Sequence, residues 1–146
     1  MLFVSGIVIA VVQGGLIGKL SKKFGDKNLS MSGILILAFG LFLFSTANSF
    51  WMLYPILGII SLGVGFITPT INSLISKIVL PNEIGEVFGV SAALNSLMSV
   101  LGPLAAGLLY DNIQPNAPYL AGTVLLIVAF ILIMRFKPPM ATKVDL

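Results

Sequence analysis

The side chains of this sequence that are best suited to bind a small molecule are three amides and one aromatic ring, all within long apolar stretches. The amides are Gln13, Asn72 and Asn95, and the ring is that of Phe66. An amide carries both donors and an acceptor, so it can recognise a polar group of a ligand. A phenyl ring offers apolar surface to an organic molecule. These four residues are therefore the candidates for the lining of a small-molecule cavity.

Two of these amides belong to stripes of small and polar residues. Steps of three and four place such residues on one face of a helix. The first stripe consists of Ser61, Gly65, Thr68, Asn72 and Ser76, and the second consists of Ala92, Asn95, Ser99, Gly102 and Ala106. A stripe of this kind either packs against another helix, since small residues permit a close approach, or lines an aqueous cavity. The sequence leaves both interpretations open, and for Phe66 the alternative is likewise helix packing.

Other kinds of chemistry are disfavoured by the residues that the sequence lacks. There is no Cys and no His, which removes thiol chemistry, imidazole catalysis and the commonest metal ligands. No Asp, Glu, Lys or Arg lies in the middle of an apolar stretch, so the chain offers no proton relay within the membrane. An activated nucleophile is also missing. We predict that the protein is not an enzyme and has no catalytic residue, no cofactor and no metal site.

The elements that position these residues are predicted to be membrane-spanning helices. Hydrophobic residues make up 58% of the 146 residues and charged residues only 9%, a balance typical of a membrane protein. A helix needs about 20 residues to cross a hydrocarbon layer of ~30 Å. Five stretches fit, at about residues 2–18, 29–47, 52–78, 87–110 and 119–134. We expect an all-α, polytopic transmembrane helical bundle, a single domain over residues 1–146 in the lipid bilayer of the cell membrane.

The basic residues predict the orientation of this bundle. All eight Lys and Arg residues fall in three stretches, from Lys19 to Lys27, at Lys77 and from Arg135 to Lys143. Loops rich in Lys and Arg stay in the cytoplasm. The N-terminus is therefore expected outside and the C-terminus inside. A net charge of +3 could suggest nucleic acid as a partner, but bases divided among three short loops are better explained by topology, so no nucleic acid is expected.

The five stretches differ in the sides that they are expected to present. The second span, 29–47, is apolar nearly all round from Leu29 to Phe44, and the fifth, 119–134, from Leu120 to Met134, so we expect these two spans to face lipid. The two striped spans, 52–78 and 87–110, are expected to face the interior. Proline at positions 55, 69 and 103 predicts tilts or kinks in the striped spans.

Three motifs resemble those of a known transporter family. The run from Gly14 to Lys27 resembles the glycine and basic loop of major facilitator superfamily transporters, with Gly18 and Gly25 suited to a tight turn. In this run Lys22 stands where the family commonly has an acid, and Asp26 stands where it commonly has a base. The other two motifs resemble parts of the drug efflux branch: a helix link at 81–89, which contains Gly85 and Gly89, and a Gly-Pro helix at 101–107, which contains Gly102, Pro103 and Gly107.

The Gly-Pro step removes a backbone hydrogen bond, so it predicts a compliant bend about which two halves of a transporter rock. An ordinary kink is the alternative.

This resemblance covers essentially the whole chain. It implies helices eight to twelve of the C-terminal half of a tetracycline or multidrug resistance-like secondary transporter, which exports small organic molecules by alternating access. Such a mechanism needs a second bundle, so the resemblance implies the N-terminal transporter half as a partner. The alternative from the residues is a small membrane scaffold that does not transport and associates through Gly14 and Gly18, an apolar G-x-x-x-G pair.

Overall fold

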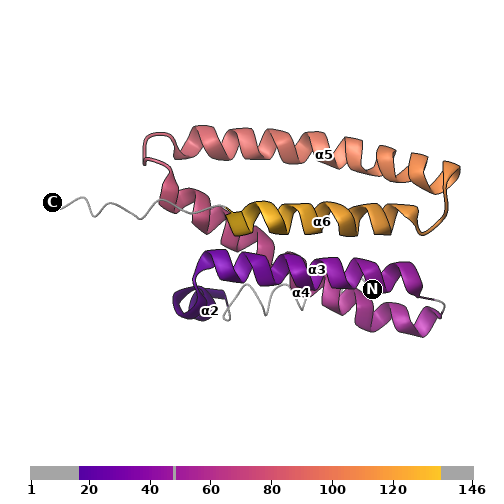
Figure 1. Cartoon of the computed structure of the whole chain (residues 1–146). Helices are drawn as coiled ribbons and strands as arrows, with labels where there is room; N and C mark the ends of the chain where they lie inside the picture. Colours follow the sequence, from indigo (N-terminus) through magenta and orange to yellow (C-terminus); the bar gives the residue numbers. More distant parts are fainter. Residues whose placement is uncertain (1–16, 48, 136–146) are drawn as a thin grey trace.

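The computed structural model describes residues 17–47 and 49–135, and within these ranges the chain is helical, without a strand (Figure 1). The helices are α2 (Ile17–Phe24), α3 (Asp26–Thr46), α4 (Phe50–Ile78), α5 (Ile84–Asn112) and α6 (Ala117–Arg135). The last four are long and apolar enough to cross a membrane. The predicted all-α membrane bundle is thereby confirmed for this part of the chain. The first predicted span, 2–18, falls almost wholly outside the described residues.

The four long helices begin and end within three residues of the predicted spans. The links between helices contain residues that disfavour helix. Gly25 separates α2 from α3 with a φ of +79°, a conformation that glycine adopts without strain. The α4–α5 link contains Pro81 and the α5–α6 link contains Pro115, residues that cannot continue a helix because they lack the N–H donor. The short links make consecutive long helices run in opposite directions (Figure 1).

The helix α3 lies at the centre, between α4 and α6, and α5 runs along α6 (Figure 1). The two ends of α3 fix its antiparallel register with α6. At one end Lys27 donates to the Met134 carbonyl oxygen at 3.1 Å, and at the other the Phe44 and Tyr119 rings lie 4.6 Å apart between centroids.

Three glycines make the contact between α3 and α4 unusually close. A Cβ added to Gly63 of α4 would stand 2.8 Å from the Leu37 backbone nitrogen, and one added to Gly40 of α3 would stand 2.7 Å from the Ile60 Cγ1. At Gly33 the added atom would meet two side chains at 3.0 Å. Small residues of this kind drive helix association in lipid, because the packing of atoms replaces the hydrophobic effect that water would supply.

The distribution of buried residues differs from the prediction for the span at 29–47. We expected this span, which is α3, to face lipid, yet α3 carries eight buried residues, whereas α5 carries none. The reason is that two helices cover α3: α4 approaches it closely at Gly33 and Gly40, and α6 packs along it as well. Its remaining surface is exposed, including Leu35, Phe39 and Phe42. The helix α6 fits the expectation, with Thr123 as its one buried position.

Bases of four helices lie at the same end of the bundle. Lys23 is in α2, Lys27 in the first turn of α3, Lys77 in the last turn of α4 and Arg135 at the end of α6. Figure 1 shows these helix ends together at one side of the molecule. A common end is the arrangement that the predicted cytoplasmic loops require.

Candidate functional site

The predicted site residues within the described part of the chain divide between two helices. Phe66 and Asn72 are on α4, and Asn95 is on α5. Gln13 and Gly14 lie outside the described residues. The motif residues Gly85, Gly89, Gly102, Pro103 and Gly107 are all on α5, Gly25 forms the turn before α3, and Gly18 is in α2.

The helix α4 presents two distinct faces. One face contacts α3 through Ile60, Gly63 and Ile67. The predicted polar stripe lies on another face, because Asn72 is nine residues after Gly63 and helical residues advance by about 100° each. The N-terminal residues of this stripe, Ser61 and Gly65, are buried, while Thr68, Asn72 and Ser76 are exposed. The stripe is therefore not the surface by which α4 packs on α3.

Phe66 is half-buried and belongs to the contact between α3 and α4. It packs, together with Leu20 and Leu62, against the buried Leu29 of α3. This is the helix packing that the sequence left open as the alternative for Phe66.

The exposed hydroxyls of both stripes form hydrogen bonds within their own helices. Ser76 donates to the Ser73 carbonyl oxygen at 3.0 Å, and Ser99 donates to the Ser96 carbonyl oxygen at 2.7 Å. Back-bonding of this kind is the usual way for a helical Ser or Thr to satisfy its hydroxyl. The amides differ: neither Asn72 nor Asn95 forms a hydrogen bond in the part of the chain that the structure describes. The donors and acceptors of these two exposed amides are therefore unused among the described residues.

The structure does not pack the two stripes against each other. The helix α5 contacts mainly α6, and it touches α4 only slightly. All positions of its stripe are exposed except Ala106, which is half-buried. A Cβ added at any of the α5 glycines would meet nothing within 4 Å, so no close contact with a described residue explains the glycines at 85, 89, 102 and 107.

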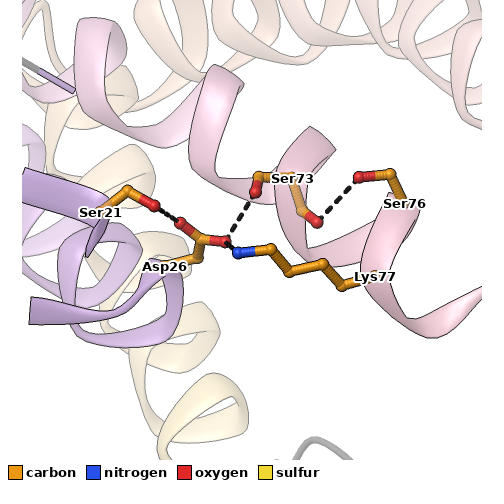
Figure 2. Close-up of polar contacts among 5 residues, drawn as sticks. All are labelled: Ser21, Asp26, Ser73, Ser76 and Lys77. Carbon is orange, nitrogen blue, oxygen red and sulfur yellow. Dashed lines mark hydrogen bonds and ion pairs between the residues drawn. The ribbon is translucent and has the colours of Figure 1, made fainter. Parts of the chain in front are cut away.

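Sequence reasoning missed the most connected polar group in the described structure, the carboxylate of Asp26. Figure 2 shows it between two helices. It accepts a hydrogen bond from the Ser21 hydroxyl on Oδ1. On Oδ2 it accepts one from the Ser73 hydroxyl at 2.6 Å and one from the Lys77 ammonium at 2.5 Å. The partners come from α2 and α4, so one side chain at the start of α3 connects three helices.

Ser21, Asp26, Ser73 and Lys77 form a cluster. Within it, the contacts of Asp26 compensate the burial of its negative charge. The Asp26 side chain is 2% exposed, whereas that of Lys77 is 63% exposed. A buried carboxylate is costly unless it is paired and hydrogen-bonded. Here one cation and two hydroxyls satisfy it, while the Lys77 ammonium also keeps access to solvent. A signal was present in the sequence, because Asp26 is the only acid in the basic stretch from Lys19 to Lys27.

The contacts of this cluster hold α2, α3 and α4 together. It offers a single carboxylate, and no group of three or more metal-ligating side chains occurs among the described residues. Together with the Asn72 and Asn95 amides, the described chain offers binding and positioning groups on apolar helices.

Comparison with known proteins gives a consistent result over the length of the chain. The sequence model of the Major Facilitator Superfamily matches residues 1–145. The chain is 31% identical to the tetracycline resistance protein, class D, of Salmonella ordonez, over 93% of this chain and 36% of that protein. It is 30% identical to solute carrier family 22 member 18 of Mus musculus, over 94% and 34%.

A third relative is multidrug resistance protein 1 of Bacillus subtilis, which is 28% identical over 94% of this chain and 35% of that protein. The chain thus spans about a third of the length of the curated relatives it matches. No solved structure matches.

Proposed function

This chain belongs to the Major Facilitator Superfamily, and from that premise we propose that it is part of a secondary active transporter that exports small organic molecules or drugs. The observation that carries the proposal is the similarity along nearly the whole chain to proteins named for tetracycline and multidrug resistance. The apolar helices α3 to α6 agree with it, since they belong to a multi-pass membrane protein. The family is one of transporters and not of enzymes.

The proposal includes a partner bundle. We assign the chain to helices eight to twelve of a C-terminal half, with five spans, the N-terminal end outside and the C-terminal end in the cytoplasm. The clustering of Lys23, Lys27, Lys77 and Arg135 at one end supports this orientation. Alternating access needs two bundles that move about a central site, so the chain acts together with an N-terminal half. The helix α5, with no buried residue, supports such a contact.

For the substrate cavity we propose the amides of Asn72 and Asn95, supported by their exposure and by the absence of a described intramolecular partner. Gln13 is proposed on its residue type alone. Phe66 is retained as an apolar contact, although its packing against Leu29 supports the structural alternative. The glycines and Pro103 of α5 are proposed to supply the compliance that lets the two bundles rock.

The proposal is tested by measuring export in everted membrane vesicles that carry the chain with an N-terminal transporter half, using a fluorescent tetracycline as the probe. Asn72→Ala should lower export at equal membrane content, because the substrate loses a hydrogen-bonding partner. Ser76→Ala is the matched control, since that hydroxyl is already bonded to the Ser73 carbonyl oxygen. Absence of probe-dependent flux in the parent would contradict the proposal.

One observation favours a second candidate, a non-transporting membrane scaffold. The helix α5 exposes a continuous apolar surface that includes Leu97, Val100, Leu104 and Leu108. Large exposed apolar surfaces serve helix association as well as lipid contact. A fixed protein partner that co-purifies with the chain, combined with no flux of any probe, would support this candidate over the transporter.

A further inference from the structure

We propose that Asp26 is a positioning residue that fastens the last turns of α4 to the corner between α2 and α3, so that this end of α4 moves with α3 as one body. The proposal concerns the arrangement of helices within the bundle. Only its consequence for export rests on the proposed function.

The Asp26 carboxylate contacts both neighbouring helices. Both of its oxygens are used: Oδ1 faces the Ser21 hydroxyl of α2, and Oδ2 faces Ser73 and Lys77 of α4 (Figure 2). The side chain is 2% exposed. A charge-assisted contact in a buried position is stronger and more directional than one in water. Both oxygens of Asp26 are therefore occupied by hydrogen bonds to other helices of this chain.

The part of α4 that Asp26 holds follows a weak point of the helix. Pro69 lies inside α4, and because it has no N–H it cannot donate to the Gly65 carbonyl oxygen, which weakens the helix there. The next residue, Thr70, is fully buried, and its hydroxyl donates to the carbonyl oxygens of Phe66 at 2.6 Å and Ile67 at 3.0 Å. Beyond this point the segment that ends at Ile78 needs contacts outside its own helix to be held in place.

The contact with α3 continues along one face of α4. Gly63 meets Leu37, and Phe66 packs against Leu29. Ser73 follows Phe66 by seven residues and Lys77 follows Ser73 by four, and both side chains meet Asp26. Helical residues at such steps share a face. The seam between α3 and α4 is thus apolar and glycine-rich in its middle and ends in the polar joint at Asp26.

The surroundings of Asp26 are basic. Lys23 and Lys27 stand near Asp26 in the chain, so removal of its charge would leave the Lys77 ammonium in a basic environment. Like charges repel one another more strongly where they are partly shielded from water. The expected result is a displaced α4 end, and with it a displaced Asn72, which precedes Ser73 directly.

The proposal is tested by the distance between two spin labels on the full chain in lipid nanodiscs. The sequence has no Cys, so Phe24→Cys on α2, where the side chain is exposed, and Ile78→Cys at the end of α4 label only these positions and leave Lys23 in place. The parent should give one narrow distance distribution. Asp26→Asn and Lys77→Gln should lose it, while Lys77→Arg, which keeps the charge, should retain it.

Ser76→Ala serves as the matched control, because this neighbour bonds only within α4, and its distribution should stay narrow. The exchange Asp26→Lys with Lys77→Asp should recover a narrow distribution, as the pair keeps opposite charges. An unchanged distribution in Lys77→Gln would overturn the proposal, and this variant suits the test because the Lys77 side chain is 63% exposed, so its replacement leaves no cavity.

A second readout separates this proposal from the proposed function. Export should fall in Asp26→Asn and in Lys77→Gln at equal membrane content, while Lys77→Arg should export as the parent does. If the parent exports nothing, the transporter proposal fails, yet the label distances still decide whether Asp26 holds α4. If the distances broaden while export is unchanged, the consequence for export is overturned.

Discussion

Gly63 of α4 lies so close to Leu37 of α3 that a Cβ at position 63 would stand 2.8 Å from the Leu37 nitrogen and 2.9 Å from its Cα. Both of those atoms belong to the backbone, so no side-chain rotation can relieve the contact. The closest approach of the two helices therefore depends on the absence of a single methyl group. Close backbone approach of this kind is what small residues provide in membrane proteins.

The first prediction is that Gly63→Ala separates α3 from α4 and destabilises the bundle by about 1–3 kcal/mol, the usual cost of overpacking. The measurement is the thermal midpoint of the detergent-solubilised protein. Gly58→Ala is the matched control on the same helix, since a Cβ there meets nothing within 4 Å, and alanine favours helix over glycine. An equal midpoint for the two variants would show that the contact at Gly63 is not limiting.

The contrast between these glycines shows how far the sequence could predict the fold. Hydropathy predicted where each long helix begins and ends to within three residues, because it is a local signal. The choice of packing face is not local. The stripe at Ser61 and Gly65 was visible as a pattern, but the residue that meets α3 is Gly63, which no regular spacing distinguishes.

The same limit applies to the candidate site. Asp26 and Lys77 are 51 residues apart, and nothing in the sequence pairs an acid in one loop with a base at the end of a later helix. Asn72 and Asn95 were found because an amide in an apolar helix is conspicuous by its type alone. Residue type thus identifies groups with unused polar atoms, whereas contacts between distant helices require the structure.

The second prediction concerns Asn95, whose amide is exposed on α5. If it contacts the substrate, Asn95→Ala should reduce export by about fivefold, as expected for one lost hydrogen bond of roughly 1 kcal/mol. Ser99→Ala, four residues further on, removes a hydroxyl that is bonded to the Ser96 carbonyl oxygen and should leave export nearly unchanged. Initial rates in everted vesicles at matched protein content provide the comparison, and equal rates for both variants would argue against a cavity role for Asn95.

The third prediction is that Pro103→Ala stabilises α5 and slows export. Pro103 lies inside α5, where it cannot donate to the Ser99 carbonyl oxygen, and a proline in a helix interior costs about 3 kcal/mol relative to alanine. Restoring the donor should raise the thermal midpoint. If the Gly-Pro step supplies the bend for alternating access, the stiffer helix should also lower the export rate. A variant that is more stable and equally active would show that the bend is only an ordinary kink.

The last prediction concerns the orientation of the bundle in the membrane. Lys23 of α2 and Asp111 near the end of α5 lie at opposite ends of the long helices, and the absence of Cys from the sequence permits a single label at each. In intact cells a membrane-impermeant maleimide should react with Asp111→Cys and should reach Lys23→Cys only after permeabilisation, because the base-rich end stays in the cytoplasm. Equal reactivity of both positions in intact cells would contradict the topology. The assignment to the C-terminal half would then fail as well, because it requires both the order of the spans and the side on which they end.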